Sequence, residues 1–155
     1  MRGFPILTIL LLINTFTLVK SKKFYFSFYV NLICRVPNRD SFGYSIQFFD
    51  KDVVWLNGPD AITQPYIDHS SPPDTGFKVT GTMTGDEIWS DYFDVYANLY
   101  HNCNTANKET KVTIHLLPLF EIGKLSDDKF YQYYLTKDIT ELSGELTHTG
   151  KLDQN

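Results

Sequence analysis

The sequence has few cysteines and lacks the short motifs that mark most catalytic and cofactor sites. Only two cysteines occur in 155 residues, and they do not form a CxxC pair. No HExxH, GxSxG, P-loop or GxGxxG motif is present. Nothing in the sequence therefore indicates an enzyme, and we expect neither a catalytic residue set nor a cofactor.

The chain has one long apolar run, and it lies at the N-terminus. Met1 and Arg2 precede the apolar segment 4–19, and a small residue suited to cleavage, Ser21, follows it. This is the pattern of a secretory signal peptide, and the run is shorter than the roughly 20 residues that span a bilayer. We expect a signal peptide over 1–21 and one domain over 22–155, in the extracellular region. A retained signal anchor is the alternative.

Stretches of basic residues are also missing. The formal net charge is −4 at pH 7, and loss of the signal peptide with its Arg2 and Lys20 makes the remainder more acidic. An acidic domain is poorly suited to nucleic acid or to anionic lipid headgroups. We therefore expect no nucleic-acid partner and, after signal cleavage, no membrane span.

The two cysteines, Cys34 and Cys103, both belong to the predicted domain. An even number of cysteines in a secreted chain predicts a disulfide. This disulfide would close a loop of about 70 residues and stabilise the fold by about 4 kcal/mol in the chain-entropy model. Two free buried thiols or an intermolecular bridge are the alternatives.

Apolar and polar residues alternate with period two through most of the domain. The even positions from Phe24 to Val36 are apolar, and so are most odd positions from Phe93 to Cys103, which puts both cysteines on apolar faces. A further strand is predicted to begin at Gly43, and others are predicted at 66–70, 77–80, 112–116, 130–135 and 139–142. Residues 82–90 are predicted to form a loop. About seven short strands without a long helix predict an all-β, two-sheet sandwich.

Metal-binding patterns are weak. His101 and Cys103 fall on one strand face, but Cys103 is better used in the disulfide, so His101 is interpreted as a satisfied core or sheet-edge histidine. Asp50, Asp52 and Asp60 lack the spacing of a calcium loop and are interpreted as solvated loop carboxylates. We expect no metal site.

Tyrosines recur on strand faces that should point outward. Tyr92, Tyr96 and Tyr100 follow one such face, and Tyr25 and Tyr29 follow another. Tyrosine combines a large contact area with a polar tip, which suits an interface, so the first three form our candidate binding surface. The alternative is that the rings cover the sheet or pair with each other across strands.

Several motifs follow one another in a set order over about residues 24–145. A cysteine-bearing strand is followed by a strand ending in D-x-D, an Asp-x-Gly-Phe turn, an H-x-C strand and a late Asp-Ile-Thr strand. In the same order, these motifs occupy residues 28–34, 46–52, 74–81, 100–104 (followed by the strand 111–114) and 138–142. This order resembles the transthyretin-like family, which is abundant among secreted nematode proteins. The resemblance implies a transthyretin- or prealbumin-like Greek-key β-sandwich and an extracellular role.

The chain also departs from that family. The second cysteine pair of many members is missing, and Arg35-Val36-Pro37-Asn38 replaces their glycine-rich turn. A related hydrolase ends in Tyr-Arg-Gly-Ser, and the tail 146–155 has no such signature. We therefore predict a non-catalytic recognition module for an extracellular protein or cell-surface partner. A carrier of a small apolar ligand is the alternative.

Overall fold

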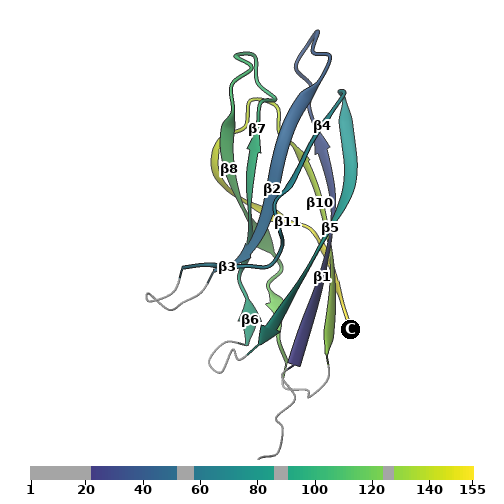
Figure 1. Ribbon diagram of the computed structural model, residues 1–155, viewed down its shortest axis with the longest axis vertical. Helices are drawn as coiled ribbons and strands as arrows, with labels where there is room; N and C mark the ends of the chain where they lie inside the picture. The colour runs from purple at the N-terminus through teal and green to yellow at the C-terminus, as the bar shows by residue number, and fades with distance from the viewer. Residues whose placement is uncertain (1–21, 52–57, 86–90, 124–127) are drawn as a thin grey trace, which may run out of the picture.

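The fold is built from β-strands alone. The computed structural model describes residues 22–51, 58–85, 91–123 and 128–155, and all regular structure in these ranges is β-strand (Figure 1). None of these residues belongs to a helix long and apolar enough to cross a bilayer. The predicted all-β class is confirmed. The predicted signal peptide lies outside the described residues.

Two sheets form the sandwich, with their strands running roughly along the long axis of the molecule (Figure 1). The four-stranded sheet has the order β12–β10–β1–β5 and consists of β1 (Lys22–Ile33), β5 (Asp74–Gly85), β10 (Lys129–Asp138) and β12 (Lys151–Gln154). The six-stranded sheet has the order β11–β8–β7–β2, with β3 and β4 both paired with β2. Its strands are β2 (Phe42–Asp50), β3 (Asp60–Ala61), β4 (Tyr66–Ser70), β7 (Val95–His101), β8 (Thr110–Leu117) and β11 (Gly144–Thr149). A separate pair joins β6 (Tyr92–Phe93) to β9 (Phe120–Glu121).

Period-two patterning explains which side chains form the core. Successive side chains of a strand point to opposite faces, so one apolar set from each strand meets between the sheets. On β1 the even residues from Phe24 to Leu32 are buried, and on β2 the even residues from Phe42 to Asp50 are buried. The rings of Phe28 and Phe48 stack across the two sheets with centroids 3.7 Å apart. The interior is therefore filled by stacked aromatic side chains at this point.

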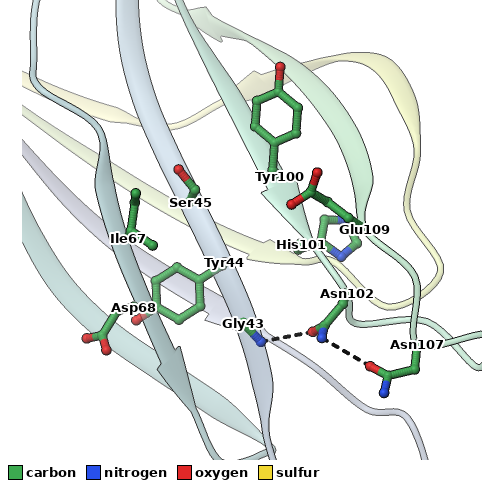
Figure 2. A pocket seen from close by; sticks show the side chains of 10 residues that line it. All are labelled: Gly43, Tyr44, Ser45, Ile67, Asp68, Tyr100, His101, Asn102, Asn107 and Glu109. Carbon is green, nitrogen blue, oxygen red and sulfur yellow. Dashed lines mark hydrogen bonds between the residues drawn. The ribbon is translucent and has the colours of Figure 1, made fainter.

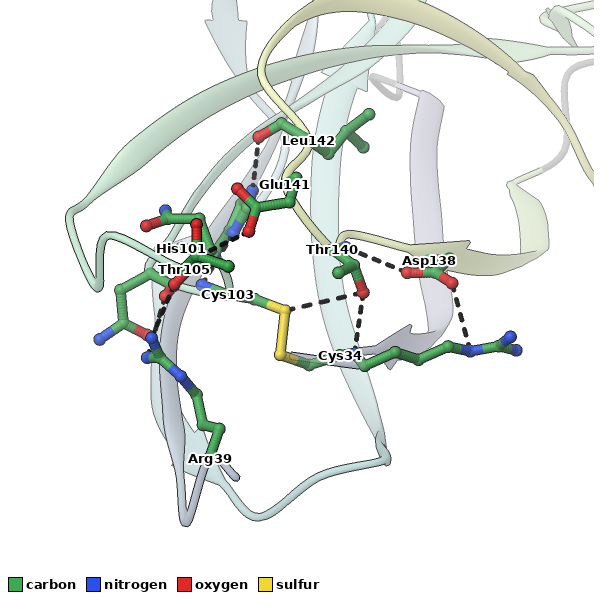
Figure 3. The surroundings of a disulfide bond; sticks show 12 residues. Cys34, Arg39, His101, Cys103, Thr105, Asp138, Thr140, Glu141 and Leu142 are labelled. Carbon is green, nitrogen blue, oxygen red and sulfur yellow. Dashed lines mark hydrogen bonds and ion pairs between the residues drawn. A yellow bond between two sulfur atoms is a disulfide. The ribbon is translucent and has the colours of Figure 1, made fainter. Parts of the chain in front are cut away.

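The predicted disulfide is present. Cys34 and Cys103 are bonded, with Cα atoms 5.8 Å apart and a sequence separation of 69 residues (Figure 3). Both side chains are fully buried, as their positions on apolar faces predicted. Cys34 lies just beyond β1, where its N–H donates to the Pro73 carbonyl, and Cys103 lies just beyond β7. The bridge therefore joins one end of the four-stranded sheet to the same end of the six-stranded sheet.

Several predicted boundaries are wrong. Residues 139–142 form a turn instead of a strand, and Glu141 has a positive φ of 57°. The predicted loop at 82–90 is a strand as far as Gly85, because its threonines pair with β1; residues 86–90 lie outside the described residues. The strand predicted from Phe93 to Cys103 is interrupted at Asp94, whose carbonyl accepts a hydrogen bond from the Lys51 N–H.

The burial of Asp50 also differs from what was predicted. It is buried at the end of β2, so it is not a solvated loop carboxylate. Asp60 is exposed and pairs with Asp50 in the ladder between β2 and β3. Asp52 lies outside the described residues. The two strands nearest the C-terminus, β11 and β12, did not appear among the predicted strands.

Candidate recognition groove

The predicted tyrosine surface is divided between two sheets. Tyr96 and Tyr100 point outward from β7, but Tyr92 belongs to β6 in the separate two-stranded pair. Tyr92 and Tyr100 are 48% and 38% exposed, whereas Tyr96 is only partly accessible. The three rings therefore do not form one continuous stripe.

Tyr96 is enclosed by its neighbours on the sheet. Its ring stacks on Phe49 of β2 at 5.4 Å and lies 5.9 Å from the ring of His115 on β8. Burial raises the pKa of the Tyr96 hydroxyl. For this residue the structure matches the alternative expectation that outward tyrosines pair across strands.

Tyr100 instead lines a groove on the outer face of the six-stranded sheet. In the strand register Ser45 lies between Ile67 on one side and Tyr100 on the other. Because Ser45 and Gly43 are small, the two larger side chains rise on either side of a low floor (Figure 2). We call this hollow of about 290 Å³ the Ile67–Tyr100 groove. The complete lining is Gly43, Tyr44, Ser45, Ile67, Asp68, Tyr100, His101, Asn102, Asn107 and Glu109.

Ile67 is the unusual member of this groove. It is 76% exposed, more than any other large hydrophobic side chain recorded as exposed in the described residues. Sequence analysis placed it in a short strand but did not assign it to a site. The available signal was a bulky aliphatic residue at an outward position of an otherwise polar strand, Tyr66–Ser70.

One carboxylate faces the groove. Glu109, from the segment just before β8, lies beside Tyr100 in the lining, whereas Asp68 on β4 lies opposite buried Tyr44 and directs its carboxylate away from the groove (Figure 2). The Asp68 carboxylate is held in place, because it accepts hydrogen bonds from the Tyr66 hydroxyl and the His69 N–H. Lys111 lies on the far side of Tyr100, with its Nζ 5.9 Å from the ring centroid. The arrangement suits a partner that presents an apolar group beside a positive charge.

The loop that forms one wall is fixed by side-chain hydrogen bonds. The Asn102 Oδ1 accepts from the Gly43 N–H at 2.8 Å, and its Nδ2 donates to the Asn107 Oδ1 at 3.0 Å (Figure 2). Arg39 donates to the carbonyls of Asn102 and Asn104 and to the Asn107 side chain. Because all of these bonds lie within the chain itself, they hold the wall in one conformation, which preorganises it for binding.

The disulfide holds the base of the same loop. Cys103 follows Asn102 directly, and the Glu141 N–H donates to the Cys103 carbonyl at 3.0 Å. The Glu141 carboxylate in turn accepts from the Thr105 N–H (Figure 3). The covalent link to Cys34 therefore ties the groove wall to the opposite sheet.

His101 is a satisfied core histidine, as predicted. It is 1% exposed, its Nδ1 accepts from the Cys103 N–H, and its Nε2 lies 3.1 Å from the Leu142 carbonyl. Burial lowers the pKa of His101, with the bond to Leu142 acting in the opposite direction. No group of three or more His, Cys, Asp or Glu side chains in the described ranges is arranged to hold a metal ion.

Comparisons with known proteins find little similarity. No protein-family model matches the chain, and no curated protein matches its sequence. A solved structure of a candidate cell adhesion protein from Bacteroides ovatus is 9% identical with a TM-score of 0.27; the match covers 87% of this chain and 43% of that one. An alternative pilotin from the type II secretion system of Vibrio cholerae is 11% identical with a TM-score of 0.33, over 84% of this chain and 98% of that one. The chain thus spans less than half the length of the first protein, and neither likeness extends to a shared function.

Proposed function

We propose that the chain is a secreted, non-catalytic recognition module that binds an extracellular protein or cell-surface partner through the Ile67–Tyr100 groove. The observation that carries the proposal is the 76% exposure of Ile67 beside Tyr100 in a preorganised groove. A large aliphatic side chain exposed to water contributes nothing to folding, so a partner that covers it gains apolar contact.

Two further features support an extracellular role. Structural disulfides persist mainly in oxidising compartments, and Cys34–Cys103 is buried between the sheets. The order of sequence motifs resembles the transthyretin-like family, and the proposal includes membership of that family and cleavage after Ser21. Mass spectrometry of the protein secreted from eukaryotic cells tests this part: the expected chain starts at Lys22, and retention of residues 1–21 would contradict it.

The partner's chemistry follows from the groove. An apolar side chain of the partner would pack between Ile67 and Tyr100, and a lysine or arginine beside it would approach Glu109. Charged pairs at the rim of an interface mainly accelerate association, whereas buried aromatic contacts slow dissociation. We therefore expect Tyr100 to control the dissociation rate and Glu109 to control the association rate and its dependence on salt.

Site-specific photo-crosslinking tests the position of the interface. A benzophenone side chain at position 67 is compared with one at exposed Thr147, on the outer face of the same sheet but on β11. The full secreted chain is exposed to extracellular fluid and surface proteins of its source. A protein captured from position 67 alone must then bind the purified wild-type chain, with affinity reduced tenfold or more by Tyr100→Ala or Ile67→Ser. Equal capture from both positions, or unchanged affinity of these variants, would overturn the proposal.

A carrier of a small apolar ligand is less well supported. The stacked Phe28 and Phe48 rings occupy the space between the sheets at the middle of the core. The Ile67–Tyr100 groove opens on an outer face and contains the Glu109 carboxylate, which disfavours an uncharged apolar ligand. Uptake of a fluorescent apolar probe by the folded protein, unaffected by Tyr100→Ala, would favour the carrier over the recognition module.

A further inference from the structure

Among the described strands, the longest open sheet edge belongs to β5. This strand of 12 residues pairs with β1 on one side and ends the four-stranded sheet on the other. The other edge strands of the two large sheets, β3, β4, β11 and β12, are only two to six residues long. Short strands at a sheet edge resist pairing with other chains, whereas a long one favours it. The edge of β5 is therefore the place where a further strand fits best.

Hydrogen bonding to β1 determines which backbone groups of β5 face outward. The Cys34 N–H donates to the Pro73 carbonyl, one step beyond the paired residues Ile33 and Asp74. Antiparallel pairs alternate between bonded and non-bonded, so the odd residues of β5 bond to β1 and the even residues direct their N–H and C=O groups away from it. These even residues are Gly76, Lys78, Thr80, Thr82 and Thr84. Within the described ranges, none of these outward groups has a hydrogen-bond partner.

The side chains of β5 differ between its two faces. The even residues are exposed or lack a side chain, and three of them are threonines. The odd residues point inward, and among them Phe77 and Met83 are partly buried against the core. The Phe77 ring stacks on Tyr66 at 4.6 Å and on Tyr44 at 5.1 Å, which fixes its position at this side of the sandwich. Because β5 is the last strand of its sheet, Phe77 and Met83 keep some apolar surface open at the edge.

We propose that β5 of a second copy of this chain adds to this edge in the antiparallel direction, with the two-fold axis at Thr80. Thr80 then faces Thr80 of the second copy, and Lys78 faces Thr82 of the second copy. On the inner face, Phe77 lies opposite Met83 of the second copy, and the symmetry produces this contact twice. The two four-stranded sheets join into one continuous sheet.

Charge distinguishes this register from its neighbours. An axis at Lys78 would set the two lysines directly opposite each other, which is unfavourable. With the axis at Thr80, four positions separate the lysines, or about 13 Å along the strands. The Lys78 Nζ also lies 5.1 Å from the Tyr29 ring centroid on β1, so it leans away from the open edge. Facing threonines are a favourable cross-strand pair.

The inward side chains select the same register. Odd residues form the non-bonded pairs of the new ladder, in which facing side chains approach most closely. The axis at Thr80 brings the Met83 sulfur toward an aromatic ring, which is a favourable contact, and covers both apolar side chains. An axis at Val79 would instead set Phe77 against Gly81, which has no side chain to cover it. A second copy supplies the complementary residues on both halves of the edge, as a self-complementary interface requires.

The expected dimer is weak and bivalent. Its interface consists of one strand edge and a few side chains, which corresponds to the small, concentration-dependent class of contacts. The Ile67–Tyr100 groove lies on the outer face of the other sheet, so each dimer presents two grooves. A partner with two binding segments would be held more tightly by both grooves than by one. The dimer goes beyond the proposed recognition function and does not depend on it.

Sedimentation equilibrium of the full secreted chain tests the proposal, over about 1 to about 100 μM, the range expected for a small interface. We expect a reversible dimer. Thr80→Lys sets two positive charges opposite each other and should raise the dimer dissociation constant tenfold or more. Thr147→Lys adds the same charge at an exposed position on β11 and should change that constant less than twofold. Thr80→Glu should also weaken the dimer, and an equimolar mixture of Thr80→Lys with Thr80→Glu should restore it.

Cysteine substitution tests the register. Residues in a bonded antiparallel pair have Cα atoms about 5.5 Å apart, which a disulfide can bridge. Thr80→Cys should therefore form a covalent dimer in a glutathione redox buffer. Thr82→Cys is the matched control, because residue 82 faces Lys78 of the second copy and should stay unlinked.

Each outcome bears on the proposal. A chain that stays monomeric over the whole concentration range, or a dimer that Thr80→Lys leaves intact, would overturn it. A mixture of the lysine and glutamate variants that stays monomeric would also overturn it, as would crosslinking through Thr82→Cys but not through Thr80→Cys. Tyr100→Ala should leave the dimer unchanged, so loss of partner binding through the groove and loss of the dimer are separate results.

Discussion

The buried ring of His101 donates a hydrogen bond to the Leu142 carbonyl. The donor is Nε2, since Nδ1 already accepts from the Cys103 N–H, and a neutral histidine carries one proton. The ring therefore links the end of β7 to the turn after β10 in one defined tautomer. This contact makes the end of the sandwich that carries the groove sensitive to pH.

Acidification should destabilise the protein. Burial lowers the pKa values of His101 and His148, so the unfolded chain binds protons that the folded chain resists. Their contribution to stability is complete above the ordinary histidine pKa of about 6.5 and is lost as the pH falls below it. Each such histidine removes at most about 1.4 kcal/mol per pH unit. Urea unfolding at pH 7.5 and 5.5 measures the effect, which His101→Gln should reduce relative to the exposed control His69→Gln.

Removal of the disulfide should weaken the whole fold. Replacing Cys34 and Cys103 with alanine removes a constraint on a loop of 69 residues. The expected loss in the free energy of unfolding is about 2–5 kcal/mol. Chemical denaturation of the oxidised wild type and of the double variant measures it. A loss below about 1 kcal/mol would show that packing alone holds the two sheets together at this end.

Gly81→Ala should be strongly destabilising. A Cβ at this position would lie 2.0 Å from the Ile62 carbonyl oxygen, so the backbone that crosses beneath β5 would have to move. Overpacking of this kind costs about 1–3 kcal/mol or more. Gly58→Ala is the matched control, because its added methyl group meets nothing within 4 Å. Similar unfolding midpoints for the two variants would contradict this account.

Tyr133→Phe should cost more than the same change at Tyr134. The buried Tyr133 hydroxyl donates to the Leu117 carbonyl, and burial raises the pKa of Tyr133 to about 12. Losing the hydroxyl removes this bond, while the Leu117 carbonyl still accepts from the Gly150 N–H, so the expected cost is about 0.5–1.5 kcal/mol. Tyr134 is 37% exposed, and Tyr134→Phe keeps its stacked ring. Thermal unfolding of the two variants makes the comparison.

Ile67→Ser should leave the free energy of unfolding within about 0.5 kcal/mol of the wild type. The Ile67 side chain is 76% exposed and belongs to a short strand at the edge of its sheet. A loss above 1 kcal/mol in urea unfolding would mean that Ile67 stabilises the fold, and the basis for assigning it to recognition would fail.

The strands that could be predicted are those in which apolar and polar side chains alternate clearly. The alternation of apolar and polar residues predicted both β1, whose even residues are buried, and β7, whose odd residues are buried. It also placed both cysteines on apolar faces, as the disulfide between the sheets requires. The strands β11 and β12 contain few apolar residues, since they lie at sheet edges and depend mainly on backbone pairing with β8 and β10. Such strands carry little periodic signal.

The candidate sites were harder to predict for a different reason. The Ile67–Tyr100 groove depends on register, which sets the neighbours of a residue across strands and is not visible in one strand alone. Ser45 becomes a groove floor only because Ile67 and Tyr100 lie beside it. Tyr29 was predicted to face outward. Its stacking with Tyr134 could not be predicted without knowing that β1 pairs in parallel with β10.

That parallel pairing also governs the order in which the chain can fold during synthesis. The first strand of the sandwich, β1, pairs over ten residues with Lys129–Asp138, more than a hundred positions later in the chain. Until that segment has been made, one edge of β1 exposes unpaired N–H and C=O groups next to a run of phenylalanines. An aggregation-prone strand therefore stays incompletely paired until residues 129–138 have been synthesised, which gives chaperones a definite segment to cover.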